Sequence, residues 1–169
     1  MIYNSNTFIF LSIFGLCREA SNNDAYGMRI QEVNVGVEAK LNTRGKVTLS
    51  SNGFDGIFID SLPRTPNTNL DLEINVENGS SLILNQNGIA GFRAPKLNSS
   101  AKLNVDVKEG GSFESCGNIQ DDIFGDVFAN AAAKFSGTGY TCDQAKVVFT
   151  GPGGSTVVKP VCQDCPPSL

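Results

Sequence analysis

The chain has 169 residues, of which 40% are hydrophobic, and its formal net charge is -4. This length allows one domain with tails, and the hydrophobic content excludes wholesale disorder. An acidic balance without a cluster of Lys and Arg argues against a nucleic-acid partner. The chain contains no histidine, which excludes the usual serine and cysteine triads and zinc-hydrolase motifs and makes catalysis the less expected function.

The first segment is an apolar run, FIFLSIFGL over 8–16, that is too short to span a bilayer. Such a run is typical of the core of a secretory signal peptide, and Gly15 and Cys17 supply small residues at the positions that a signal peptidase reads. We predict a signal peptide over 1–17, and a secreted or cell-surface protein without a membrane span after its removal. A buried cap segment is the alternative. The polar residues 18–29 are interpreted as a linker.

Short strands are predicted from residue 30 onward, where hydrophobic and polar residues alternate. Over 70–76, for example, Leu72, Ile74 and Val76 alternate with acidic and amide residues, which indicates a strand with one buried face. The turn pairs Asn78-Gly79 and Asn87-Gly88 follow, with further short strands after each. Three strands therefore make one unit, which we call a coil.

The unit repeats along the chain. A shift of 31 residues places Leu72 on Leu103, and a shift of 35 residues toward the amino terminus places the turn Asn87-Gly88 on Asn52-Gly53. Because one coil cannot bury its apolar face alone, successive coils are expected to stack in parallel. The expected ladders of equivalent residues are Val47, Leu82 and Phe113; Leu49 and Leu84; Ile57, Phe92 and Ile123; Leu72 and Leu103; and Asn52, Asn87 and Asn118 at one turn.

With this coil pattern and these Asn-Gly turns, the segment from about Val33 to Gly151 resembles the right-handed parallel β-helix proteins, the pectate-lyase-like superfamily and its adhesin relatives. The resemblance implies an all-β fold, a right-handed parallel β-helix of about four coils over 30–151. It also implies a structural or adhesive module whose partner is an extracellular polysaccharide or a cell-surface component. A carbohydrate-active enzyme is the main alternative, and ice binding is a minor one.

The C-terminal third departs from the repeat. The segment VFANAAAKF over 127–135 has a helix-forming composition, and we expect a short helix there. A strand is predicted over 146–150 and an edge strand over 156–161. Residues 152–169 are rich in Cys and Pro and are interpreted as a cap that closes the stack.

Four cysteines remain after the predicted signal peptide: Cys116, Cys142, Cys162 and Cys165. An even number in an exported chain predicts two disulfides, for which three pairings exist. We expect Cys162 and Cys165 each to bond back to Cys116 or Cys142. A four-cysteine zinc site and a C-x-x-C redox pair are the alternatives, although Cys116 and Cys142 lack the spacing of a zinc ribbon.

The acidic residues Asp121, Asp122 and Asp126 are candidate calcium ligands, and beyond this calcium we predict no cofactor. Resemblance to β-helix polysaccharide hydrolases implies instead that Asp121 and Asp122 act as a general acid and base. Those hydrolases also use a histidine and a basic pair, which this chain lacks, and neighbouring residues on a strand point to opposite faces. A solvated acidic turn is the third interpretation, and no catalytic residue is assigned.

Two glycosylation sequons begin at Asn78 and Asn98, both at expected turns. They would be accessible in an exported protein. Threonine is sparse and out of register between coils, so the sequence shows no regular ice-binding array.

Overall fold

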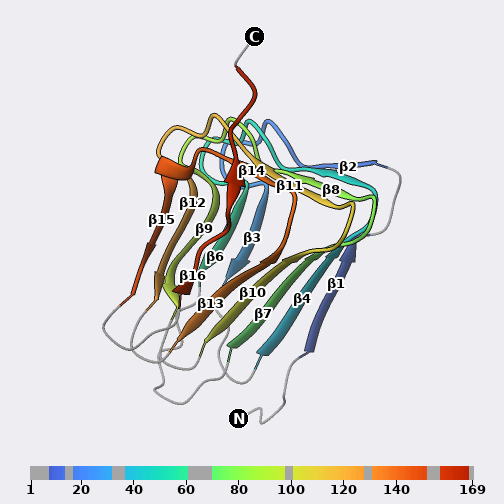
Figure 1. The fold of residues 1–169 in the computed structure, drawn as a ribbon, viewed down its shortest axis with the longest axis vertical. Helices are drawn as coiled ribbons and strands as arrows, with labels where there is room; N and C mark the ends of the chain where they lie inside the picture. Colours follow the sequence, from blue (N-terminus) through green and yellow to red (C-terminus); the bar gives the residue numbers. More distant parts are fainter. Residues whose placement is uncertain are drawn as a thin grey trace.

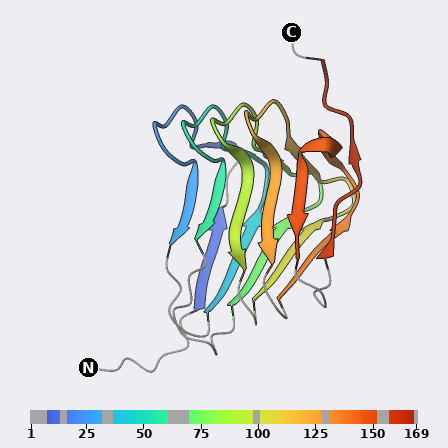
Figure 2. The same ribbon diagram turned by 90° about the vertical axis from the view of Figure 1, so that its left-hand side faces the viewer.

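The structure is a computed structural model, and it describes residues 8–13, 17–31, 37–60, 70–97, 101–127, 131–151 and 157–167. Its strands form three parallel sheets, which we call sheets A, B and C in the order in which the chain enters them. Each sheet takes every third strand, so the chain passes from A to B to C and returns to A beside its previous strand (Figures 1 and 2). This all-β arrangement is compatible with the β-helix-like fold that the repeat predicts.

The strand bounds follow this order through the three sheets. Sheet A contains β1 (Phe8–Ile13), β4 (Val37–Thr43), β7 (Leu70–Val76), β10 (Lys102–Val107), β13 (Ala132–Gly137) and β16 (Val157–Val158). Sheet B contains β2 (Cys17–Glu19), β5 (Lys46–Thr48), β8 (Ser81–Ile83), β11 (Ser112–Ser115), β14 (Tyr140–Cys142) and β17 (Cys162–Gln163). Sheet C contains β3 (Met28–Gln31), β6 (Ile57–Asp60), β9 (Ala90–Leu97), β12 (Asp121–Val127) and β15 (Val147–Thr150). One short 3-10 helix, η1 (Gln144–Lys146), precedes β15, and within the described ranges no helix has the length and hydrophobicity to cross a bilayer.

The described strands fall into five groups of three and a final pair, whereas the sequence predicted about four coils. The difference lies at the amino-terminal end, where β1, β2 and β3 precede or overlap the first predicted strand. In the structure β1 pairs with β4 over its whole length. Cleavage of the signal peptide stays a prediction.

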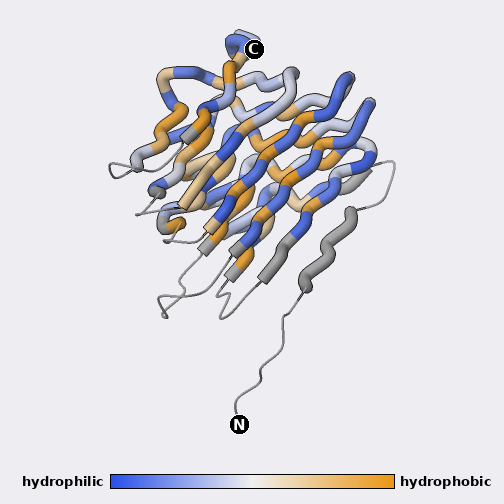
Figure 3. Tube along the Cα trace, turned by 60° about the horizontal axis from the view of Figure 1, so that its bottom comes forward, coloured by the Kyte–Doolittle hydropathy of each residue, from blue (hydrophilic) through white to orange (hydrophobic). Residues whose placement is uncertain are grey.

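The registers confirm the ladders expected from the repeat. Leu72 pairs with Leu103, Leu82 pairs with both Val47 and Phe113, and Phe92 pairs with both Ile57 and Ile123. Because a slip of one residue would turn every side chain to the opposite face, the alternation of hydrophobic residues fixes this register. The hydrophobic and hydrophilic bands that run across neighbouring strands show the result (Figure 3).

The ladder residues form a single buried core inside the three sheets. Leu82, Phe92, Phe113 and Ile123 are fully buried at its centre. Leu49 and Leu84 follow the ends of β5 and β8, and both are buried as well. Each added coil therefore extends the same apolar interior, which is how short strands obtain a core in a stacked fold.

The helix expected over 127–135 is wrong. Residues 121–127 form β12, and 132–137 form β13, which pairs with β10. Ala133 pairs with Leu103 and Phe135 pairs with Val105, and all four side chains are buried in the core. Burial against the preceding coil outweighs the weak helical preference of the alanines.

Candidate functional site

A ladder of asparagines runs along the corner between sheets B and C. This asparagine ladder is formed by Asn23, Asn52, Asn87 and Asn118. The Oδ1 atoms of Asn52, Asn87 and Asn118 each accept two hydrogen bonds from the asparagine of the preceding coil. Asn87 Oδ1 accepts from the backbone N–H of Asn52 at 3.1 Å and from its Nδ2 at 3.0 Å, and Asn118 Oδ1 accepts from the same atoms of Asn87 at 2.9 and 3.0 Å. The predicted stack of Asn52, Asn87 and Asn118 is confirmed. Asn23, which lies outside the predicted repeat, donates to Asn52 in the same way.

Asp122 ends this ladder. Its Oδ1 accepts a hydrogen bond from Asn118 Nδ2 at 2.9 Å, and its Oδ2 accepts one from the backbone N–H of Asp143 at 2.7 Å. Its register position follows Asp121, which pairs with Ala90, so it lies opposite Gly91. A Cβ on Gly91 would meet Ser115 Oγ at 1.9 Å and the carbonyl oxygen of Leu84 at 2.8 Å, so the preceding coil has no room for a side chain at this position. This fully buried carboxylate thus serves the fold.

The other two candidate calcium ligands have different surroundings. Asp121 is half-buried, and burial raises the pKa of its carboxyl while the charge of Lys146 acts in the opposite direction. Asp126 accepts a hydrogen bond from Thr150 Oγ1. The structure therefore gives the three carboxylates separate partners, and in the part of the chain that it describes no group of three or more Cys, Asp or Glu residues could hold a metal ion.

The four cysteines form two disulfides in the pattern expected. Cys116 is bonded to Cys165 and Cys142 to Cys162, with Cα–Cα distances of 5.8 and 5.3 Å that are normal for the bond. They fasten the tail, whose strands β16 and β17 pair with β13 and β14. Neither cysteine of the C-x-x-C pair is bonded to the other. Disulfides of this kind suggest an oxidising environment.

The sequon residue Asn78 lies in the exposed turn between β7 and β8. Asn98 lies outside the described residues.

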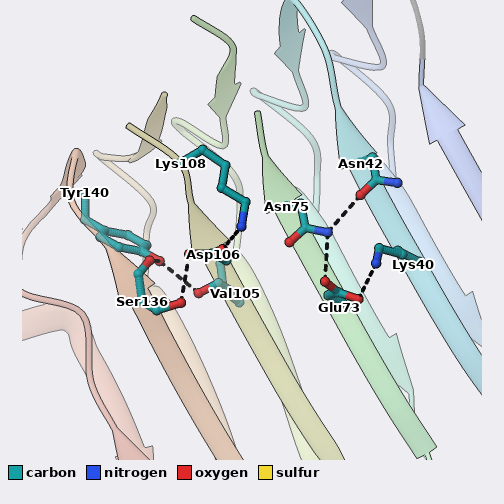
Figure 4. Close-up of polar contacts among 9 residues, drawn as sticks. All are labelled: Lys40, Asn42, Glu73, Asn75, Val105, Asp106, Lys108, Ser136 and Tyr140. Carbon is teal, nitrogen blue, oxygen red and sulfur yellow. Dashed lines mark hydrogen bonds and ion pairs between the residues drawn. The ribbon is translucent and has the colours of Figure 1, made fainter. Parts of the chain in front are cut away.

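The outward side chains of sheet A form a polar face, whose central members are Lys40, Asn42, Glu73, Asn75, Asp106, Lys108 and Ser136 (Figure 4). On β4 and β7, Lys40 Nζ lies 2.7 Å from Glu73 Oε2, and Asn75 Nδ2 donates to Glu73 Oε1 at 3.0 Å and to Asn42 Oδ1 at 2.8 Å. The hydrogen bond from Lys40 is the main reason that the pKa of Glu73 is lowered.

The next strands of the polar face, β10 and β13, carry a similar set of polar contacts. Asp106 forms an ion pair with Lys108 and accepts a hydrogen bond from Ser136 Oγ at 2.8 Å. These two interactions lower the pKa of Asp106, with Lys108 making the larger contribution. Both central carboxylates are thus neutralised by a neighbouring lysine while remaining accessible to water.

The outer face of sheet C differs, because it carries arginines and aromatic rings in one row. Arg29, Phe58 and Arg93 pair in register on β3, β6 and β9. The guanidinium carbon of Arg93 lies 4.6 Å from the centroid of the Phe58 ring, and that of Arg29 lies 5.6 Å from it. These distances are those of cation–π contacts.

Two further aromatic residues extend this row toward the corner. Tyr26 stacks on Phe58 with 5.0 Å between centroids, and Phe54 packs against Tyr26 at 5.4 Å. Phe58 is only 7% exposed, whereas Phe54 is 43% exposed. We call the five residues Tyr26, Arg29, Phe54, Phe58 and Arg93 the arginine–aromatic patch.

A buried carboxylate fixes one arginine of the patch. Asp55 is fully buried and accepts hydrogen bonds from Arg93 Nε at 3.0 Å and from Arg93 Nη2 at 2.7 Å. Its Oδ1 also accepts from the backbone N–H of Ala90 at 3.1 Å. Burial raises the pKa of Asp55, and Arg93 acts in the opposite direction. This two-pronged ion pair holds the guanidinium in one orientation.

The arginine–aromatic patch is the arrangement in the described chain best suited to binding. Exposed aromatic surface beside oriented guanidinium groups is the composition found at the centre of protein interfaces. The patch could not be predicted from the sequence, because its members meet only after residues 28 to 35 positions apart are brought onto neighbouring coils. Comparisons with protein-family models, with curated proteins and with solved structures found no match.

Proposed function

We propose that this chain is a right-handed parallel β-helix that acts outside the cell as a structural or adhesive module and binds polysaccharide through the arginine–aromatic patch. The handedness is supported by the general rule that connections between parallel strands of one sheet are right-handed. The location is supported by the two disulfides, which persist in oxidising compartments.

The observation that carries the binding proposal is the exposed Phe54 ring, which packs against Tyr26. Arg29 in turn lies over the Tyr26 ring and Arg93 over the Phe58 ring. The apolar face of a sugar ring packs well against an aromatic side chain, and guanidinium N–H groups donate to hydroxyl oxygens. Because Asp55 already fixes Arg93, little side-chain entropy would be lost when a ligand binds.

The arrangement of the carboxylates favours a binding protein over a hydrolase. A glycosidase needs two carboxyl groups facing one bond, and Asp122 is buried as the end of the asparagine ladder. The competing proposal of a carbohydrate-active enzyme retains Asp121, whose raised pKa is a property of many catalytic acids.

The binding test is co-sedimentation of the protein with a panel of insoluble polysaccharides. Phe54→Ala is expected to weaken binding about tenfold, as removal of a central aromatic contact does at interfaces. The matched control is Val161→Ala, which removes an exposed apolar side chain from the tail. Equal binding by the two variants, or no binding by the unaltered protein to any member of the panel, would refute the proposal.

The enzymatic alternative has its own test. We expect no release of sugar products from the same polysaccharides, and we expect Asp122→Asn to leave binding intact. Turnover by the unaltered protein that disappears in Asp121→Asn would establish the enzyme instead. Fractionation of cells and sequencing of the mature amino terminus would test the proposed export.

A further inference from the structure

The chain contains three asparagine–glycine pairs, and the fold places them in two environments. Asn52-Gly53 and Asn87-Gly88 belong to the asparagine ladder, whereas Asn78-Gly79 forms the exposed turn between β7 and β8. Glycine has no side chain to shield its backbone nitrogen, so this dipeptide is the one most prone to deamidation. We propose that Asn78 deamidates spontaneously in the folded protein and that the ladder protects Asn52 and Asn87.

The reaction uses only water and the chain itself. The backbone nitrogen of Gly79 gives up its proton to the solvent and attacks Cγ of Asn78. A nitrogen–Cγ bond forms, the Cγ–Nδ2 bond breaks, and the side-chain nitrogen leaves as ammonia after taking a proton from water. Water then opens the resulting succinimide ring on either side, which gives aspartate or isoaspartate at position 78. No oxidation or reduction takes place.

Burial and hydrogen bonding protect Asn52 and Asn87 from this reaction. Asn52 is 2% exposed and Asn87 is fully buried. The Asn87 carboxamide makes three hydrogen bonds, because its Oδ1 accepts from Asn52 twice and its Nδ2 donates to Asn118. The attacking nitrogens are engaged as well, with Gly53 N donating to Asn23 O at 2.7 Å and Gly88 N to Asn52 O at 2.8 Å. Deamidation at these sites therefore requires local opening of the stack.

Fewer interactions have to break before deamidation at Asn78-Gly79. The Asn78 side chain is exposed and has no hydrogen-bond partner among the residues that the structure describes. Gly79 N donates to Gly110 O at 3.1 Å, the longest of the three glycine contacts. An added Cβ on Gly79 would meet nothing within 4 Å, so solvent reaches the site freely. One hydrogen bond at the surface has to break before the attack.

The modification changes the surface chemistry of one corner. Either product places a new negative charge beside Glu77, where β7 ends. Isoaspartate also adds a carbon to the backbone of a turn that packs over Gly110. A glycan on the predicted sequon would occupy the same Nδ2, so the modification is tested on protein from a host that does not glycosylate.

The experiment is incubation of the full chain at mildly alkaline pH, followed by peptide mapping that separates asparagine, aspartate and isoaspartate. In the folded protein Asn78 is expected to deamidate faster than either ladder asparagine by on the order of tenfold or more, because buried sites react only through local opening. In urea the three pairs are expected to react at similar rates, which shows that the fold causes the difference. Equal rates in the folded protein, or faster reaction at Asn52 or Asn87, would overturn the proposal.

Discussion

The outer faces of sheets A and C both carry carboxylates beside cations, yet the pKa values of these carboxylates shift in opposite directions. On the polar face, hydrogen bonds from Lys40 and Lys108 lower the pKa of Glu73 and Asp106. On and beside sheet C, burial raises the pKa of Asp55 and Asp121 despite nearby cations. The difference teaches that the ion pair itself does not decide the outcome. What decides it is how much water the carboxylate loses.

The largest expected effect is a difference in the free energy of unfolding when one carboxylate is removed from each face. Asp55→Ala is expected to lower the free energy of unfolding by about 3 kcal/mol, because it removes one partner of a buried ion pair. Glu73→Ala, on the solvated polar face, is expected to cost less than about 1 kcal/mol. Urea denaturation of both variants measures the contrast. Similar losses would show that the two ion pairs are equivalent.

The second prediction concerns the aromatic ring between the two arginines. Phe58→Leu keeps an apolar side chain but loses the stacking with Tyr26 and the cation–π contacts, so we expect a loss of about 1–2 kcal/mol. Phe124→Leu is the matched control, because Phe124 lies in the same row and is more exposed. Thermal unfolding compares them, and an equal loss in the control would mean that the contacts with arginine add nothing.

The third prediction uses the opposite pKa shifts. Because the folded protein raises the pKa of Asp121 above its ordinary value of 3.8, it holds that proton more tightly than the unfolded chain does. The contribution of Asp121 to stability therefore falls as pH rises through the interval above 3.8. The pKa of Glu73 is lowered from 4.5, so its contribution falls as pH drops below 4.5.

Matched amides test these signs. Both variants are compared with the unaltered protein by urea titration at several acidic pH values. The unaltered protein should lose some stability as pH rises toward neutral because of Asp121, and Asp121→Asn should not show this loss. The unaltered protein should also lose some stability at low pH because of Glu73, and Glu73→Gln should not show that loss. Because both side chains reach solvent, the changes are small. A shift of the same sign in both variants would contradict the burial argument.

The smallest effect is expected at the rim of the polar face. Lys102 Nζ lies 3.8 Å from Asp71 Oδ1, and its side chain is 65% exposed. Lys102→Gln is expected to change the free energy of unfolding by about 0.3 kcal/mol or less, and added salt should reduce this difference further because it screens exposed charges. A loss above about 1 kcal/mol would show that exposed pairs on this face carry more of the stability than such pairs usually do.

The ladders, the parallel pairing and the stacked asparagines could be predicted from the sequence because local alternation and Asn-Gly turns specify them. The buried role of Asp122 could not, since it depends on the point at which the ladder ends. The strand over 132–137 was missed because its hydrophobic partners lie on β10, about one coil earlier. The arginine–aromatic patch was also hidden, as the pairing of Asp55 with Arg93 spans two different coils.

In the asparagine ladder the number of residues per coil varies, but the spacing between stacked asparagines does not. Its successive members are 29, 35 and 31 residues apart, yet every contact between neighbouring carboxamides measures 3.0 Å. Extra residues are therefore absorbed elsewhere in the circuit and leave the corner unchanged. Such a frame should accept a foreign peptide inserted between a strand of sheet C and the next strand of sheet A without loss of the stacked asparagines.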